Sequence, residues 1–322
     1  MTPRDMERLT LTVAERDELR GLADRLAGTE PQRVDERPWV DRARALSCAV
    51  PRRLRERLRA FRNDPGTDGL LLVSGLPVDP AALPPTPTVP ESVERTATAA
   101  AAVQALLTLH LGEIIAFRNE KAGALVQNVV PVPGREASQS NSGAEVLEMH
   151  IENAFHPHRP DFVALFCLRN DHEDQAGLQV GSIRRAAALL SDDDRKVLSE
   201  ERFVTEPPPS FGDMAGAAVP HAVLTGAWDD PDVRVDFLST HPQDEGARAA
   251  MRALQDAFAE VTRTLVLRTG ELALLDNRLT IHGRTAFTPR YDGNDRWLYR
   301  TFVHLDHRRS RALRAGNGNV LA

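Results

Sequence analysis

Cysteine is scarce in this 322-residue sequence, which contains only Cys48 and Cys167. Two cysteines are too few for a disulfide scaffold, and the N-terminal segment is charged and lacks the apolar core of a signal peptide. We therefore expect a protein of the reducing cytoplasm. No run of about 18 apolar residues is present, so the sequence predicts no membrane-spanning helix.

Basic residues are not in excess either. The chain has 40 Lys and Arg against 46 Asp and Glu, a formal net charge of −6 and a pI near 6.0. A nucleic-acid-binding surface usually appears as a basic stripe instead. No glycine cluster stands in the strand–turn–helix setting of a nucleotide-binding loop. These absences favour a small molecule as the partner, with no nucleic acid and no membrane, and they leave the oligomeric state open.

The first 110 residues predict helices around one strand. Thr12 and Glu15 have the spacing of a capping box, and leucines then recur at helical intervals. Further helices are expected at about residues 52–61 and in the alanine-rich stretch 95–111. Residues 69–75 are apolar between two glycines, which predicts a buried strand. This part of the chain should pack on the outside of a core formed by later residues.

Beyond about residue 114 the sequence changes to short apolar runs separated by glycine and proline, which is typical of a β-rich core. A helix is predicted near residues 246–265, where apolar side chains form one stripe. Residues 205–230 form a long irregular segment of the kind that often covers an active site. We predict one domain over residues 1–322, mainly β with flanking helices, in which 205–230 is an active-site lid. Strands are expected at about 124–130, 161–168, 234–238, 271–275 and 296–303.

Three residues of this β-rich part could hold a metal ion. His150 and Glu152 are two residues apart, so in a strand both side chains point to the same face. His282 follows an apolar run and precedes a glycine. Two histidines and one carboxylate form the facial triad that suits iron(II) and leaves positions open for a co-substrate and dioxygen. A zinc hydrolase could use the same ligands, so the triad alone does not decide the chemistry.

Two arginines follow the third candidate ligand. Strand alternation places Arg296 and Arg300 on one face, about 13 Å apart at roughly 3.3 Å per residue, so that two carboxylates could be bound. A guanidinium binds a carboxylate through two parallel hydrogen bonds and stays charged, which suits the distal carboxylate of 2-oxoglutarate. The alternative is that both arginines pair with surface acids.

At these residues the sequence resembles the clavaminate synthase-like branch of the iron(II)/2-oxoglutarate oxygenases, which includes hydroxylases of free arginine, asparagine and lysine. The resemblance touches most of the chain beyond about residue 110. It implies a double-stranded β-helix, or jelly-roll, core with helices packed outside it. The matching stretches are Gln127–Pro131, Glu148–Asp161 and Asp276–Thr301.

The resemblance also implies roles for single residues. His150, Glu152 and His282 match the iron ligands, and Arg296 matches the arginine that grips 2-oxoglutarate. Arg300 matches the position that meets the α-carboxylate of the substrate. The remaining matches are pocket residues: Asn141 and Glu120 at the substrate, and Asp236 on the side of the lid.

The sequence departs from the family at two points. A threonine that often assists 2-oxoglutarate binding is absent near Leu178 and Gln179, which leaves the second co-substrate anchor open. Arginine-specific relatives have an acid two residues before the Asp236 position, where this chain has Arg234. An arginine beside a single carboxylate is a poor clamp for a guanidinium, so we expect a lysine-like or neutral polar side chain on the substrate.

The activity implied by the resemblance is oxidation of an unactivated C–H bond with iron(II), 2-oxoglutarate and dioxygen. Hydroxylation at C3 or C4 of a free L-amino acid or a derivative, in specialised metabolism, is the default expectation. Desaturation or ring closure remains open, whereas Glu152 argues against chlorination, because halogenating relatives have a small residue there. Alternatives of another class are a non-catalytic metal-binding jelly roll and a zinc hydrolase, for which Arg296 would have no task.

Other residues receive plainer interpretations. His156 and His158 could support the metal ligands, but a surface or hydrogen-bonding role is the expectation. His304 and His307 fall in an arginine-rich tail that we interpret as a solvated charge run. Cys167 lies in an apolar strand, where a buried small hydrophobic residue is expected.

Overall fold

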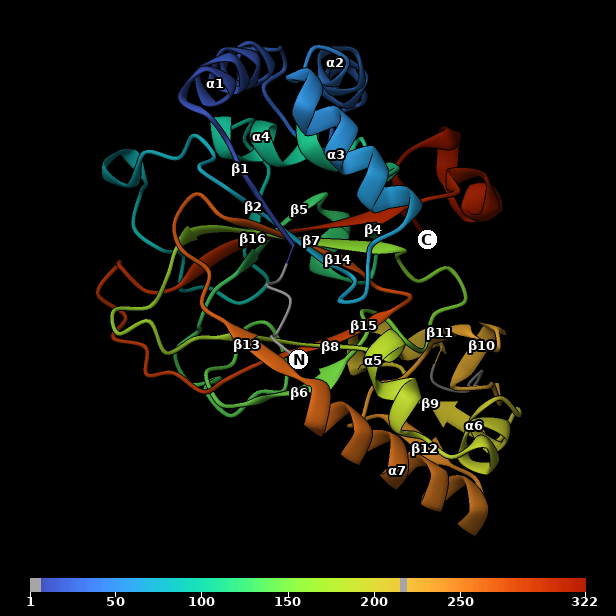
Figure 1. Cartoon of the computed structure of the whole chain (residues 1–322). Coiled ribbons are helices and arrows are strands. Elements are labelled where there is room, and N and C mark those ends of the chain that lie inside the picture. The colour runs from blue at the N-terminus through green and yellow to red at the C-terminus, as the bar shows by residue number, and fades with distance from the viewer. Residues whose placement is uncertain (1–6, 215–218) are drawn as a thin grey trace.

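The computed structural model describes residues 7–214 and 219–322. Four helices near the N-terminus cover one face of a large sheet, in a layer at the top of Figure 1. The predicted capping box is present: the Thr12 hydroxyl accepts from the Glu15 amide at 3.2 Å, and the Glu15 carboxylate accepts from the Thr12 amide at 2.8 Å. The helices are α1 (Val13–Ala27), α2 (Arg37–Ser47), α3 (Arg52–Asn63) and α4 (Ala99–Thr108).

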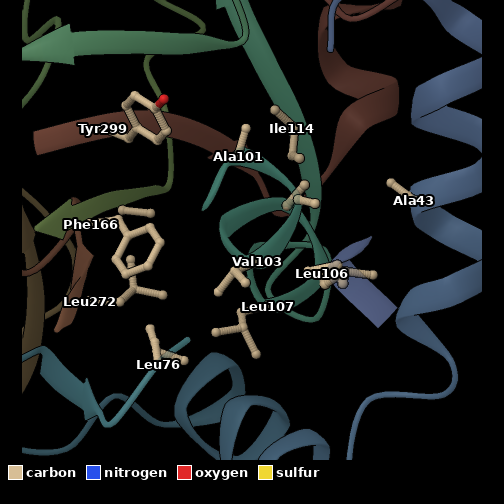
Figure 2. Packing of buried hydrophobic residues seen from close by; sticks show 14 of the residues in the cluster. Ala43, Leu76, Ala101, Val103, Leu106, Leu107, Ile114, Phe166, Leu272 and Tyr299 are labelled. Carbon is tan, nitrogen blue, oxygen red and sulfur yellow. The ribbon is translucent and has the colours of Figure 1, made fainter. Parts of the chain in front are cut away.

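The innermost of these helices, α4, lies directly on the sheet. Its alanines keep the helix narrow, and its side chains from Ala101 onward are buried. Figure 2 shows Val103 and Leu107 on the side of this helix that faces Phe166 and Leu272 of the sheet. Each large apolar side chain buried in this way contributes about 1.5–3 kcal/mol to folding. The helical layer is therefore anchored to the sheet by an apolar core.

In the part of the chain that the structure describes, the large sheet has nine strands. Its main path runs β1-β2-β14-β7-β16-β4-β17, while β5 pairs with β16 beside β4, and β3 pairs with β5. The long antiparallel pair β7 and β16 forms its centre. The strands are β1 (Glu7–Thr10), β2 (Leu70–Ser74), β3 (Val93–Glu94), β4 (Glu113–Phe117), β5 (Val126–Val129), β7 (Phe162–Arg169), β14 (Leu272–Asp276), β16 (Trp297–His304) and β17 (Val320–Leu321).

A second sheet of four antiparallel strands runs in the order β13-β8-β15-β6. Side chains of both sheets, such as Leu165 and Val180, share one apolar cluster. Two sheets that enclose a common core form the double-stranded β-helix that was predicted, and the predicted buried strand at 69–75 is confirmed as β2. The strands are β6 (Leu147–His150), β8 (Leu178–Ser182), β13 (Arg263–Leu265) and β15 (Thr280–Arg284).

The outer face of the small sheet is covered by α7 (Glu245–Val261), with α5 (Ile183–Ala186) and α6 (Asp192–Leu198) beside it (Figure 1). Two short antiparallel pairs complete this side of the molecule. They are β9 (Phe203–Thr205) with β12 (Thr240–Pro242), and β10 (Leu224–Ala227) with β11 (Asp230–Val233). Within the described residues, no helix is both long and apolar enough to cross a membrane.

Two predicted boundaries were wrong. The strand expected at 234–238 is absent, because β11 ends at Val233 and the chain then turns: Oδ1 of Asp236 accepts the amides of Leu238 and Ser239 at 2.8 and 3.3 Å. The helix expected to reach residue 265 ends at Val261. Thr262 adopts an extended conformation there, and the short strand β13 follows it.

The basic C-terminal tail is only partly the solvated charge run that was predicted, because Arg308 and Arg311 are exposed whereas other residues of the tail are anchored. His304 is fully buried and hydrogen-bonds to the carbonyl of His158 at 3.0 Å. Arg309 forms an ion pair with Asp161 at 2.8 Å. Arg314 is 1 % exposed and donates to backbone carbonyls and to a serine hydroxyl within the tail. Two of its arginines, Arg309 and Arg314, therefore hold the tail in place.

Two further side chains of the core can be compared with their predictions. Cys167 is fully buried, as expected, and burial raises the pKa of its thiol to about 12. His156 is buried rather than at the surface, but the expected hydrogen-bonding role is confirmed, because its Nδ1 accepts the amide of His158 at 3.0 Å. Its ring also packs edge-on against Phe117, with 4.8 Å between the ring centres.

Buried histidines should make the protein acid-sensitive. Burial lowers the pKa of His110, His156, His221 and His304 from 6.5 to about 4. Between these two values the unfolded chain binds more protons than the folded one, so stability is full above pH 6.5 and is lost as the pH falls toward 4. We expect the melting temperature to drop through this window and to drop less steeply in His304→Gln. Parallel melting curves for the two proteins would contradict this account.

Candidate functional site

A cavity of about 830 Å³ opens beside the small sheet. Every site residue predicted from the sequence lines this cavity. Its buried wall includes apolar residues of both sheets, such as Val129, Leu165 and Leu178. Residues 205–211, the first part of the predicted lid, form another wall. Residues 215–218 of that predicted lid lie outside the described part of the chain.

The three candidate metal ligands converge in this cavity. His150 ends β6, Glu152 follows it, and His282 in β15 stands directly opposite His150 in the strand register. One ligand atom from each residue lies within 4.8 Å of the other two. Gly283 permits this close pairing, since a Cβ there would lie 2.6 Å from the carbonyl oxygen of Leu147.

The donor set fits a metal ion. Nδ1 of His150 lies 2.7 Å from the carbonyl oxygen of Glu148, a contact that fixes the orientation of the ring. Nδ1 of His282 is buried without a hydrogen-bond partner, whereas buried polar atoms are nearly always paired. Nε2 of His282 lies 3.5 Å from Glu152. Two imidazoles and a carboxylate in this arrangement can form a facial triad with open positions for other ligands.

Asn277 holds the carboxylate ligand in place, a role that sequence reasoning missed. Its Oδ1 accepts the amide of Glu152 at 2.8 Å, and its Nδ2 donates to the carbonyls of Glu152 at 3.1 Å and of Pro160 at 2.9 Å. The side chain is buried. The sequence offered one hint of this role, since Asn277 lies in the stretch from Asp276 that matches the family. The contact itself could not be foreseen, because Glu152 lies 125 residues earlier.

We expect Asn277→Ala to lower both iron affinity and turnover by roughly 10- to 100-fold, because residues that orient a metal ligand typically have effects of this size. Asn277→Asp keeps the acceptor for the Glu152 amide, so its iron affinity and turnover should lie between those of Asn277→Ala and the wild type. Iron titration and succinate release measure the two effects. Asn294→Ala, at an exposed side chain, is the matched control, and equal behaviour of Asn277→Ala and this control would remove Asn277 from the site.

Arg300 links the metal ligands to the substrate side of the cavity. Its Nη1 donates to Glu152 at 2.7 Å, its Nε donates to Gln127 at 3.0 Å, and it pairs with Glu120. Glu120 also accepts from Asn153 at 3.2 Å. The structure therefore brings the predicted residues Glu120 and Arg300 into direct contact at the triad.

The charges in this network depend on one another. Burial by itself would raise the pKa of Glu152, but Arg300 and the two histidines outweigh it and hold that pKa well below its ordinary value. For Glu120, burial raises the pKa, Arg300 opposes this effect and Glu152 adds to it. A charged ligand can therefore replace one member of these ion pairs and bind the group that is released.

Arg296 differs from Arg300, since it has no acidic partner within hydrogen-bonding distance among the described residues. It is 5 % exposed and lines the cavity just before β16, which has an irregularity between Trp297 and Leu298. Burial lowers the pKa of Arg296 to about 10. Both Arg296 and Arg300 line the cavity, as predicted, and Arg296 is free to bind an anion.

The remaining predicted pocket residues also line the cavity. Asp236 stands opposite His150 in an isolated bridge, and Asn141 lies in the loop before β6. The expectation that Arg234 adds a positive charge beside Asp236 was wrong. Its guanidinium donates to the carbonyls of Ala154 at 2.6 Å and Phe155 at 2.9 Å and is not part of the cavity wall. Asp236 thus faces the cavity without a neighbouring arginine.

Comparison with known proteins identifies the family. Residues 49–302 match the family described as taurine catabolism dioxygenase TauD, TfdA family. The chain belongs to this family. It is a dioxygenase that uses iron(II), 2-oxoglutarate and dioxygen.

Its relatives include enzymes of the clavaminate synthase-like branch. The chain is 49% identical to an L-asparagine oxygenase of Streptomyces coelicolor over 97% of this chain and 94% of the relative. It is 35% identical to clavaminate synthase 2 of Streptomyces clavuligerus, over 90% of each chain. A solved structure of asparagine oxygenase with Fe(II), 2S,3S-3-hydroxyasparagine and succinate superposes with a TM-score of 0.94, at 48% identity and 98% coverage of both chains.

Proposed function

We propose that this free-amino-acid hydroxylase acts on L-asparagine and places a hydroxyl group on C3. The observation that carries the proposal is the polar ring around the triad, formed by Arg300, Glu120, Asn141 and Asp236. The relative with 49% identity, an L-asparagine oxygenase, supports the same substrate. The reaction consumes 2-oxoglutarate and dioxygen and releases succinate and carbon dioxide with the hydroxylated amino acid.

In this proposal His150, Glu152 and His282 hold the iron, and Arg296 holds the distal carboxylate of 2-oxoglutarate. When bound, iron(II) supplies the activation of dioxygen that is coupled to oxidative decarboxylation of the co-substrate. The protein supplies the ligands, the orientation of both substrates and the exclusion of water. The segment 205–211, which forms one wall of the cavity, serves as its cover.

The charges of the amino acid find partners of opposite sign. Arg300 binds the α-carboxylate, and Glu120 accepts a hydrogen bond from the ammonium group. The side-chain carboxamide has both donors and an acceptor, and Asp236 and Asn141 supply the complementary groups. A carboxylate at Asp236 disfavours L-aspartate, because two like charges would meet there.

The same placement selects the carbon that is oxidised. Arg300 contacts Glu152 at 2.7 Å, so the α-carboxylate that it binds lies close to the triad. Asp236 stands opposite His150 and binds the other end of the molecule. Two carbons lie between these ends, and C2 carries the ammonium group that Glu120 binds, so C3 is the methylene that this placement presents to the metal.

A panel of free amino acids tests this function. L-Asparagine, L-aspartate, L-glutamine, L-lysine, L-arginine and a carrier-bound asparaginyl group are each offered to the iron-loaded enzyme. Succinate release and product mass are measured, and NMR locates the modified carbon. We expect turnover with free L-asparagine and a gain of one oxygen at C3. Loss of two hydrogens would indicate desaturation or ring closure instead, and turnover confined to another amino acid or to the carrier-bound group would overturn the substrate.

Asp236→Asn gives a direct test of the carboxamide contact. Asparagine at this position can still accept the amides of the turn but lacks the charge, so only the ligand contact is weakened. Hydrogen bonds to charged groups contribute about 1.5–3 kcal/mol, which predicts a KM for L-asparagine roughly 10- to 150-fold higher. The KM for 2-oxoglutarate should stay unchanged. Asp256→Asn, on the exposed face of α7, is the control, and an unchanged KM for L-asparagine would exclude Asp236 from substrate binding.

A further inference from the structure

Arg284, the last residue of β15, is a buried cation in the wall of the cavity. It is 3 % exposed, and its Nη2 donates to the carbonyl of Glu145 at 2.8 Å. Its Nε is buried and has no hydrogen-bond partner among the residues that the structure describes. The guanidinium lies over the ring of Phe287, 5.3 Å from the ring centre. One backbone carbonyl and one ring leave most of this charge without compensation, and burying an unpaired charge is costly.

No carboxylate compensates it. Among the described residues, neither Arg284 nor Arg296 forms an ion pair, although both line the same cavity and both are buried. The charged group that acts on Arg284 is Arg296, which has the same sign. Two like charges in a medium of low dielectric constant repel each other, and an anion bound between them would remove this cost.

The strand geometry places Arg284 at a suitable distance from the metal site. His282 and Arg284 are two residues apart in β15, so their side chains share a face about 6–7 Å apart. In the register of the small sheet Arg284 stands opposite Leu178, which is apolar and offers no hydrogen bond. A co-substrate held by the metal at one end would have its other end within reach of Arg284.

We propose that Arg284 is a second binding cation for the distal carboxylate of 2-oxoglutarate and shares that carboxylate with Arg296. The shared anion neutralises both guanidiniums. Arg284 thereby takes the place of the threonine that often assists 2-oxoglutarate binding and that is absent near Leu178 and Gln179. The two arginines also make the site selective for 2-oxoglutarate, because an oxo acid without the distal carboxylate would leave two buried cations unpaired. This role does not depend on which amino acid is hydroxylated.

The test separates the distal carboxylate from the rest of the co-substrate. Iron-loaded enzyme is titrated without oxygen with 2-oxoglutarate and with 2-oxopentanoate, in which a methyl group replaces the distal carboxylate. Binding is followed by the metal-to-ligand charge-transfer absorption. For Arg284→Gln we expect the Kd of 2-oxoglutarate to rise by ten-fold or more, while the Kd of 2-oxopentanoate stays the same or falls. Arg284→Lys, which keeps a charge but not the planar fork, should lie between.

Equal weakening of both oxo acids would show that Arg284 only supports the fold, and an unchanged Kd for 2-oxoglutarate would also overturn the proposal. Melting temperatures of the variants report folding, and Arg284→Lys provides the same comparison if the glutamine variant does not fold. Arg296→Gln is titrated in parallel. A loss confined to Arg296→Gln would leave the distal carboxylate to that residue alone and reject the shared site.

Discussion

Glu152→Ala is expected to abolish hydroxylation of every amino acid and to weaken iron binding. The variant keeps two histidines but loses the anionic ligand, and an uncharged pair binds a divalent cation far less tightly than the complete triad. A second effect adds to the first. Arg300 loses the partner that it contacts at 2.7 Å and keeps only Gln127 and Glu120, so the guanidinium that should bind the substrate is held less firmly.

The measurements for Glu152→Ala are iron content after dialysis, succinate release and the melting temperature of the metal-free protein. We expect the first two to fall to background while the fold is retained. Glu260→Ala, at an exposed position on α7, controls for the loss of an acid as such. His282→Ala should behave in the same way as Glu152→Ala. Full activity in either variant would show that the triad does not hold the catalytic metal.

One part of the metal site, the pair of His150 and Glu152, could be predicted from the sequence because its geometry is local. Strand alternation alone places His150 and Glu152 on one face, and antiparallel pairing of β6 with β15 then sets His282 opposite His150. The jelly-roll core followed from short apolar runs of the right length together with the resemblance to a family. The capping box of α1 was predictable for the same reason, since its two residues lie within one turn.

The features that sequence analysis missed depend on contacts between distant segments. Asn277 acts on backbone atoms 125 residues away, and no periodicity reports such a contact. Arg234 points away from Asp236 because the chain leaves the strand after Val233, and strand alternation does not apply beyond that point. Arg309 of the C-terminal tail is anchored because Asp161, which is far from it in the sequence, lies beside the end of β16 and pairs with it.

Unpaired cations in the cavity have a consequence for stability. Arg296 is buried without an acidic partner among the described residues, so in the absence of 2-oxoglutarate it destabilises the fold. Residues that bind a ligand often lower the stability of the ligand-free protein in this way. Wild-type enzyme should therefore gain more thermal stability from 2-oxoglutarate than any variant that lacks this cation.

Arg296→Met is expected to raise the KM for 2-oxoglutarate by roughly thirty- to several-thousand-fold, since losing one partner of a buried charge pair costs about 2–5 kcal/mol. The turnover number at saturating 2-oxoglutarate should change much less, because the contact is made equally before and during the reaction. Arg296→Lys should restore part of the affinity. Arg290→Met, an exposed arginine that pairs with Glu173, is the control.

The metal-free Arg296→Met protein should also melt at a higher temperature than the metal-free wild type, whereas 2-oxoglutarate should stabilise the iron-loaded wild type far more than the iron-loaded variant. This opposite sign distinguishes a binding role from a structural one, because an arginine that supported the fold would lower the melting temperature when removed. An unchanged KM for 2-oxoglutarate, or a less stable metal-free variant, would show that Arg296 does not provide the site for the distal carboxylate.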